Sequence, residues 1–171
     1  MNISYLLIGG NQGERTAQLA LAREKIAARA GRLLRVSSLY ETAAWGKTDQ
    51  ASFLNQALEL ETSLEATVLI DVLLDVEEQM GRRRLEKYGS RIIDIDILFF
   101  NDAILRLPNL VIPHPEIQNR RFALTPMAEI APLLIHPVLG RNITELLEAC
   151  PDPLAVQRLT NNEGTEHKLN K

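Results

Sequence analysis

The feature that most constrains the fold is a nine-residue segment, 92–100, in which Asp94 and Asp96 are the only residues that are not apolar. A run of this length suits a strand in the centre of a sheet. Side chains alternate along a strand, so the two aspartates share one face and the isoleucines beside them share the other. We therefore expect the isoleucines to enter the core and the two carboxylates to lie together on the opposite face.

Paired carboxylates in a strand need a physical reason, because aspartate is depleted in strands and an unpaired charge there is costly. Carboxylates on alternate residues lie about 6–7 Å apart along a strand. That spacing can hold one or two hard cations, with phosphate oxygens completing the coordination. The alternative is a pair of charges that protects an exposed sheet edge. Because the segment is so apolar on its other face, we favour a metal site in a central strand.

Hydrophobic periodicity and turn residues predict the other elements in order. The expected strands are 3–8, 33–41, 53–61 and 92–100, followed by a short hairpin strand at 103–107. The expected helices are 14–30, a helix capped by Thr62 or Ser63 and ending near Met80, and short helices near 122–130 and 144–150. This order is the βαββαβ pattern of a ferredoxin-like α+β sandwich, extended by extra C-terminal strands and short helices.

Length and charge limit the classes of protein that fit. A chain of 171 residues corresponds to one domain, which we expect over residues 1–160, with a polar, flexible tail at 161–171. The 19 basic and 22 acidic residues give a net charge of −3, which disfavours general binding to nucleic acid or to an anionic membrane. No apolar stretch approaches the roughly 18 residues of a membrane span, and no signal peptide is recognisable, so we expect a cytoplasmic protein.

A cluster of basic residues comes directly before the aspartate strand. It consists of Arg82, Arg83, Arg84, Lys87 and Arg91. Arginines bind phosphate through two parallel hydrogen bonds, and several together can clamp a polyphosphate. The alternative is a solvated helix end, where cations also suit the helix dipole. The position next to two carboxylates favours phosphoryl-transfer chemistry, which commonly combines a metal with arginine.

Two weaker patterns lie elsewhere in the chain. His114 stands between two prolines, which hold the imidazole outward where it can hydrogen-bond a phosphate or a ribose. Phe53 and Asn55 share one face of a predicted strand, where a ring beside an amide can stack on and read a flat heterocycle. Taken alone, each pattern is more often structural: a histidine in a turn, a phenylalanine in the core and a solvated asparagine.

Several of these motifs together resemble one enzyme family. Segment 87–98 is similar to the signature of the 6-hydroxymethyl-7,8-dihydropterin pyrophosphokinases of folate biosynthesis. Further segments resemble the family in the same order along the chain: 8–11, 37–42, 53–55, 81–84, 111–114 and 119–122. The resemblance covers residues 3 to about 150, and several separate motifs in the right order are far more specific than any one of them.

The resemblance implies a function and a set of residue roles. The family transfers pyrophosphate from ATP to the hydroxymethyl group of the dihydropterin and releases AMP. The implied catalytic residues are Arg82, Arg91, Asp94 and Asp96, with two Mg²⁺ ions bound by Asp94 and Asp96. The implied ATP-binding residues are Glu77, Arg84, His114 and Arg120. The implied pterin-binding residues are Thr42, Phe53, Asn55, Tyr88 and Phe122. A monomer with ATP and the dihydropterin as its partners is expected.

The chain also departs from the family pattern. Tyr88 stands where many members have tryptophan, Asn109 where some have arginine, Pro115 where an aromatic is common and Leu74 where glutamine is common. None of these alters the aspartate pair, so we expect changed affinities and retained activity. Two other functions remain open at this point. A non-catalytic ferredoxin-like small-molecule-binding module would release no AMP, and an RNA-binding module would need a basic face with exposed aromatic residues.

Overall fold

A computed structural model of the chain describes residues 1–43, 51–81 and 92–160. Residues 1–100 contain β1 (Asn2–Gly10), α1 (Arg15–Arg29), β2 (Arg32–Val36), β3 (Tyr40–Thr42), β4 (Phe53–Thr62), α2 (Ala66–Gln79) and β5 (Asp94–Phe100). After them come β6 (Leu105–Leu107), β7 (Leu110–Ile112), a 3₁₀ turn (Ile117–Asn119), α3 (Arg121–Ile130), α4 (Ile143–Glu148) and β8 (Val156–Arg158). The protein is thus a mixed α+β structure, as expected.

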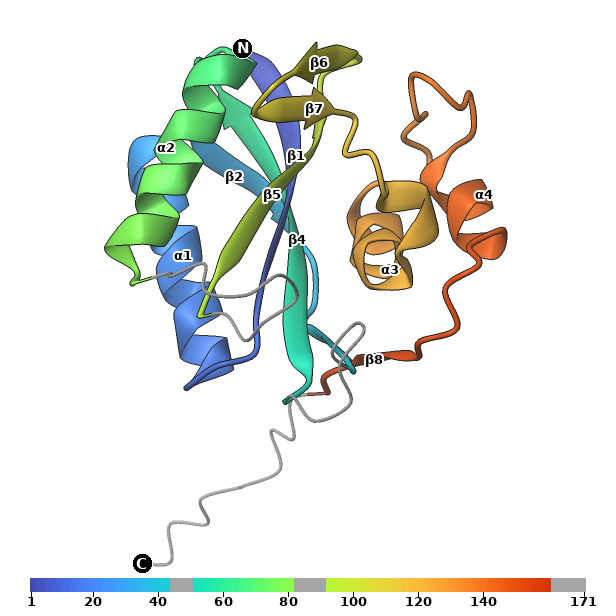
Figure 1. The fold of residues 1–171 in the computed structure, drawn as a ribbon, viewed down its shortest axis with the longest axis horizontal. Helices are drawn as coiled ribbons and strands as arrows, with labels where there is room; N and C mark the ends of the chain where they lie inside the picture. Colours follow the sequence, from blue (N-terminus) through green and yellow to red (C-terminus); the bar gives the residue numbers. More distant parts are fainter. Residues whose placement is uncertain (44–50, 82–91, 161–171) are drawn as a thin grey trace, which may run out of the picture.

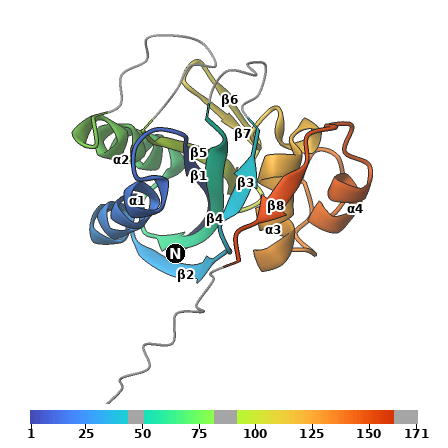
Figure 2. The same cartoon turned by 90° about the horizontal axis from the view of Figure 1, so that it is seen from below.

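A six-stranded sheet separates the helices into two layers. Its strands follow the order β5-β1-β4-β3-β8, and β2 pairs with β4 as well. Every pairing within it, among the residues described, is antiparallel. Helices α1 and α2 cover one face, whereas α3 and α4 lie on the other (Figures 1 and 2). None of the helices described is long and apolar enough to cross a membrane.

Each face of the sheet has its own hydrophobic core. The core under α1 and α2 includes Ile26 and Leu73 from the helices and Leu58 and Ile95 from the strands. The core under α3 and α4 includes Leu7, Ala57, Leu98, Phe99, Leu124 and Met127. Because neighbouring residues of a strand point to opposite faces, β4 supplies Leu58 to the first core and Ala57 to the second.

The single strand expected over 33–41 is wrong, because the chain breaks into β2 and β3 at Ser37. The hydroxyl of Ser37 accepts a hydrogen bond from the backbone N–H of Ala57 at 2.9 Å. The backbone N–H of Ser37 donates to the carbonyl of Ala57, also at 2.9 Å, and the amide of Gln56 donates to the carbonyl of Ser37 at 2.7 Å. A side-chain oxygen therefore substitutes for a backbone acceptor of the ladder, and β3 begins three residues later.

The expected cap of the second helix is also wrong. Helix α2 begins at Ala66 after Glu65, and Thr62 remains in β4. The hydroxyl of Thr62 donates to the carbonyl of Ala30 at 2.5 Å and accepts from the N–H of Leu64 at 3.1 Å. It therefore joins the end of α1 to the turn before α2. The strand expected at 103–107 exists in part, as β6, but it pairs with β7 in a separate two-stranded sheet.

Candidate active site

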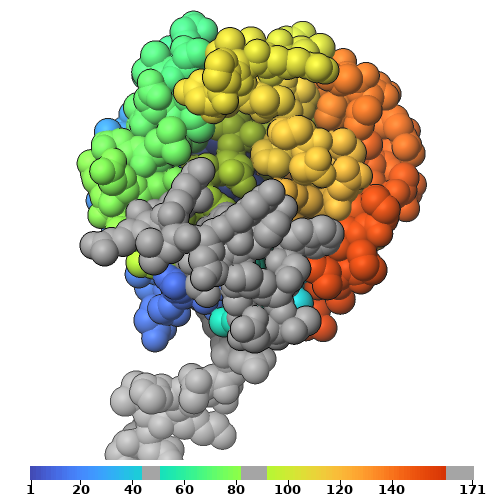
Figure 3. Space-filling model, viewed as in Figure 1, coloured from blue at the N-terminus to red at the C-terminus, as the bar shows by residue number. Residues whose placement is uncertain are grey.

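The two aspartates of β5 lie on the face of the sheet that α3 covers. Ile95 and Ile97 are 3% and 4% exposed in the core under α1 and α2. Asp94 and Asp96 are half-buried and point to the other side, where their Cα partners on β1 are Gly9 and Leu7. The alternation read from the sequence is confirmed. In the space-filling view, β5 forms the floor of a hollow between α2 and α3 (Figure 3).

The expectation that this strand is central is wrong, since β5 stands at one end of the sheet order. Its outer edge is covered in another way. The carboxylate of Glu77, which is 3% exposed, accepts a hydrogen bond from the backbone N–H of Ile95 at 2.7 Å. The backbone N–H of His114 donates to the carbonyl of Leu98 at 2.9 Å. Edge groups are therefore satisfied by α2 and by the segment after β7, and the aspartates project from the face of the sheet.

A row of residues crosses the sheet from the aspartates. Asp94, Gly9, Asn55 and Tyr40 are successive Cα partners on β5, β1, β4 and β3. Residues paired in this way present their side chains on the same face. Neighbouring strands lie about 4.8 Å apart, so Asp94 and Asn55 are separated by about 10 Å along this row. The sheet thus holds a carboxylate and a buried amide at a fixed separation.

Gly9 leaves the space that the side chain of Asn55 occupies. A Cβ atom added at Gly9 would collide with Oδ1 of Asn55 and would lie 3.2 Å from the backbone carbonyl of Leu54. The amide of Asn55, in a residue that is 6% exposed, therefore lies across the Cα of Gly9. Any larger residue at position 9 would displace that amide.

Thr42 and Phe53 stand next to this row. They are Cα partners at the ends of β3 and β4, two residues along from the pair formed by Tyr40 and Asn55, and so they share its face. Thr42 is 2% exposed, and its Oγ1 has no hydrogen-bond partner among the described residues. A buried hydroxyl without a partner is costly. A polar ligand atom bound at this point would satisfy it, beside the half-buried ring of Phe53.

The segment after β7 brings His114 toward the same carboxylates. The peptide bond before Pro113 is cis. Burial, and to a lesser extent the nearby Arg120, lower the pKa of His114 to about 4, against the opposing effects of Glu116 and Asp94. The ring is therefore neutral at pH 7. Its Nδ1 accepts a hydrogen bond from the N–H of Glu116 at 3.1 Å, so Nε2 carries the proton and can donate to an anionic oxygen.

The two arginines before Phe122 have different tasks. The guanidinium carbon of Arg120 lies 5.7 Å from the centroid of the Phe122 ring, which is a cation–π contact. Arg121 instead donates to the carbonyls of Cys150 and Asp152 at 3.0 and 3.2 Å, and it fixes the segment after α4. The family resemblance assigned a role to Arg120 alone, and the bonds of Arg121 to distant carbonyls leave no local signal in the sequence.

Comparison with known proteins assigns the chain to a family. The model of the 7,8-dihydro-6-hydroxymethylpterin-pyrophosphokinase (HPPK) family matches residues 5–132. The chain belongs to the HPPK family. It is 41% identical over 160 residues to the 2-amino-4-hydroxy-6-hydroxymethyldihydropteridine pyrophosphokinase of Methylorubrum extorquens, covering 93% of this chain and 99% of that protein. The corresponding enzyme of Pseudomonas aeruginosa is 39% identical over 148 residues, covering 86% of this chain and 91% of that one.

Solved structures agree with this assignment at the level of the fold. The HPPK-DHPS of Plasmodium falciparum, crystallised with pteroate, superposes with a TM-score of 0.71 at 19% identity. The match covers 86% of this chain and 42% of that one, so the chain spans less than half of that longer protein. HPPK enzymes transfer pyrophosphate from ATP to hydroxymethyldihydropterin in folate biosynthesis, and the chain is an enzyme of this kind.

Some residues expected in the HPPK site lie outside the described parts of the chain: Arg82, Arg84, Tyr88 and Arg91. Within the described parts, no group of three or more metal-ligating side chains gathers in one place. Among the described residues, the candidate metal ligands are Asp94 and Asp96. That set fits Mg²⁺, which keeps several waters and is usually bound through one or two carboxylates together with substrate phosphates.

Proposed function

We propose that Asp94 and Asp96 bind two Mg²⁺ ions together with the phosphates of ATP, and that the dihydropterin lies over Asn55 in the same row of the sheet. The observation that carries this proposal is the register that puts Asp94, Gly9 and Asn55 side by side on one face. A polyphosphate held at the aspartates would then reach toward a heterocycle held at the amide. The separation of about 10 Å leaves room for both substrates between these two groups.

The nucleotide side of the site combines cations with one neutral donor. Arg82 and Arg91 neutralise charge on the transferred group, and Arg84 and Arg120 bind the phosphates of ATP. His114 donates from Nε2 to a phosphate or ribose oxygen, which its low pKa supports because the ring stays neutral. Glu77 lines the nucleotide pocket, and its carboxylate also holds the backbone of β5 between Asp94 and Asp96.

The pterin side combines stacking with hydrogen bonds. Phe122 on α3 and Tyr88 form the two aromatic surfaces on either side of the ring, with Phe53 beside it. The amide of Asn55 and the backbone and hydroxyl at Thr42 read the polar edge of the ring. The buried, unpartnered Oγ1 of Thr42 supports this role, since a bound heterocycle would satisfy it.

The reaction follows from this placement. The hydroxymethyl oxygen attacks the β-phosphorus of ATP in line with the bond to the leaving AMP, and its proton passes to solvent or to a phosphate oxygen. Bound Mg²⁺ supplies charge neutralisation at the phosphates. The protein contributes alignment of the two substrates and the cationic arginines, so no strong general base is required.

The fold and organisation that we propose agree with this function. The order β5-β1-β4-β2, with α1 and α2 crossing one face, supports a ferredoxin-like βαββαβ core. We propose one pyrophosphokinase domain over 1–160, acting as a monomer. The departures at Leu74, Tyr88, Asn109 and Pro115 change affinities only. Leu74 is 39% exposed on α2, consistent with a position that tolerates substitution.

Calorimetry on two variants tests the division into two subsites. Asn55→Ala is expected to weaken pterin binding and to leave ATP binding unchanged. His114→Ala is expected to weaken ATP binding more than pterin binding. In parallel, AMP release is measured with and without the dihydropterin and Mg²⁺. Equal losses of both affinities in both variants would refute the assignment, and AMP release that needs neither pterin nor Mg²⁺ would refute the mechanism.

A further inference from the structure

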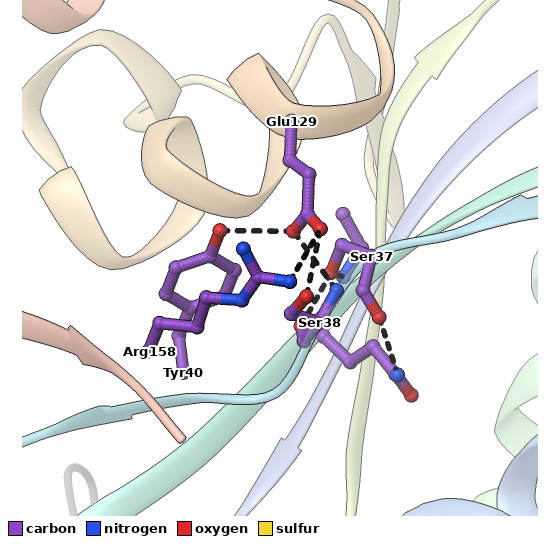
Figure 4. A network of polar contacts seen from close by, with 7 residues as sticks. Ser37, Ser38, Tyr40, Glu129 and Arg158 are labelled. Atoms are coloured by element: carbon purple, nitrogen blue, oxygen red, sulfur yellow. Dashed lines mark hydrogen bonds and ion pairs between the residues drawn. The ribbon is translucent and has the colours of Figure 1, made fainter. Parts of the chain in front are cut away.

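A surface carboxylate outside the proposed site joins α3 to β3 and to the link before that strand. Glu129 lies near the C-terminal end of α3, and its side chain is 29% exposed. It accepts hydrogen bonds from the N–H of Ser38 at 2.9 Å, the hydroxyl of Ser38 at 2.7 Å and the hydroxyl of Tyr40 at 2.8 Å. Arg158 on β8 approaches to 4.0 Å. Figure 4 shows these groups converging on the one carboxylate.

The electrostatics keep this cluster in one protonation state. Burial alone would raise the pKa of Glu129, but hydrogen bonds from Ser38 and Tyr40 and the charge of Arg158 lower it overall. Burial and the bond to Glu129 raise the pKa of Tyr40 to about 12. At neutral pH the carboxylate of Glu129 is therefore ionised and accepts, and the phenol of Tyr40 is protonated and donates.

The segments that the carboxylate joins carry the two sides of the proposed pterin pocket. Phe122 lies on α3, seven residues before Glu129 and so about 10 Å along the helix axis. Tyr40 is the Cα partner of Asn55 and lies two residues before Thr42 on β3. Glu129 is thus bonded to the strand that carries Thr42 while sharing a helix with Phe122.

Apolar packing alone does not fix this geometry. Leu124 and Met127 hold α3 against the sheet through contacts without a preferred direction. Hydrogen bonds are directional, so the three donors to Glu129 set where the helix stands relative to β3. The link between β2 and β3 that carries Ser38 is itself anchored to β4, because Ser37 exchanges hydrogen bonds with Ala57.

We propose that Glu129 is a positioning residue for the pterin, which fixes α3 against β3 so that Phe122 and Thr42 stand at the separation a flat ring needs. This proposal rests on the proposed pterin site. Its signature is selective: the bonding partners of the carboxylate are Ser38, Tyr40 and Arg158, none of which is a proposed phosphate-binding residue. Its removal should therefore raise the pterin KM more than the ATP KM, to which only Arg120 at the start of α3 is linked.

Steady-state kinetics of Glu129→Gln test the proposal. The pterin KM is expected to rise about three- to tenfold, the range for losing charged hydrogen bonds at a partly exposed site. The KM for ATP and kcat at saturating pterin are expected to stay within about twofold of wild type, as for a change outside the reacting groups. Glu148→Gln, which changes an exposed glutamate on α4, is the matched control and should leave all three constants unchanged.

Three further variants keep the outcome decisive. Tyr40→Phe removes one donor and keeps the ring, so it should raise the pterin KM in the same direction by a smaller factor; it decides the matter if Glu129→Gln does not fold. An unchanged pterin KM, or equal rises in both KM values, overturns the proposal. If Asn55→Ala and Phe122→Ala also leave the pterin KM unchanged, the pterin site itself is wrong, whereas if they raise it, only the role of Glu129 fails.

Discussion

The two faces of the sheet are built differently. The face under α1 and α2 is mostly apolar along β1, β4 and β5, with Gln56 of β4 bonded there to Arg23 of α1. Its helices contribute Ile26, Leu69 and Leu73, each fully buried. The face under α3 is apolar only in part. Under α3, Leu7 and Ala57 belong to the hydrophobic core. The next pair on the same face, two residues along each strand, is Gly9 and Asn55. The first face is therefore almost wholly a hydrophobic core, whereas the second combines a core with polar groups available to substrates.

The largest expected effect is a loss of activity on substitution of Asp96, on the partly polar face of the sheet. Asp96→Ala should lower the rate of AMP release by at least about 10²–10³-fold, the loss typical of removing one preorganised electrostatic group from an active site. Asp96 is half-buried and belongs to neither hydrophobic core, so the circular dichroism spectrum and the unfolding midpoint should change little. AMP release close to that of wild type would refute the assigned role.

The opposite effect is expected from the apolar face. Ile26→Ala, which truncates a fully buried side chain of α1, should lower the free energy of unfolding by about 2–5 kcal/mol. The folded fraction should retain kcat within about twofold, since α1 contributes no residue to the row of Asp94, Gly9, Asn55 and Tyr40. Urea unfolding and AMP release on the same preparation separate the two quantities. A large loss of kcat without a loss of stability would refute the claim that this face supports folding and takes no part in catalysis.

The sequence predicted the contrast at β5 but not its surroundings. Alternation of aspartate and isoleucine is a local pattern, so the two faces of this strand could be predicted. Its place at the end of the sheet could not, because Glu77 and His114 cover the edge from distant segments. The break at Ser37 depends in the same way on a bond to β4.

The site was predicted in the same uneven way. Motifs pointed to Asp94, Asn55 and His114, which the fold brings to one face or to its rim. The need for glycine at position 9 depends on cross-strand register, and the bond between Glu129 and Tyr40 depends on how α3 docks. Neither relation leaves a local signal in the chain. The first relation is set by the pairing of β1 with β4, and the second by the position of α3 against β3.

A smaller effect is expected from a substitution at Gly9, in the row that Asp94, Gly9, Asn55 and Tyr40 form across the sheet. Gly9→Ala would place a methyl group against the amide of Asn55. Overpacking of this kind costs about 1–3 kcal/mol of folding stability, which displacement of the amide would relieve. We expect weaker pterin binding with unchanged ATP binding, measured by calorimetry. Because the nucleotide subsite serves as the internal control, loss of both affinities would argue that the methyl group distorts β1 as a whole.

The smallest effect concerns His114. In the protein without ligand or metal, its imidazole should titrate near pH 4 by NMR, with His114→Gln used to identify the resonance. The unfolded chain takes up this proton near pH 6.5, so the unfolding free energy should fall as the pH drops from about 6.5 toward 4. That loss should be smaller in the variant. A midpoint near 6.5 would mean that the ring is exposed and away from the arginine.

The central claim is that the aspartates of β5 bind the metal ions that hold the nucleotide. The most direct test counts Mn²⁺ ions bound per chain by electron paramagnetic resonance, in the presence of a non-hydrolysable ATP analogue, for wild type and for Asp96→Asn. Our account predicts two ions for wild type and fewer than two for the variant, with AMP release lost in parallel. Two ions bound equally well by both proteins would contradict it.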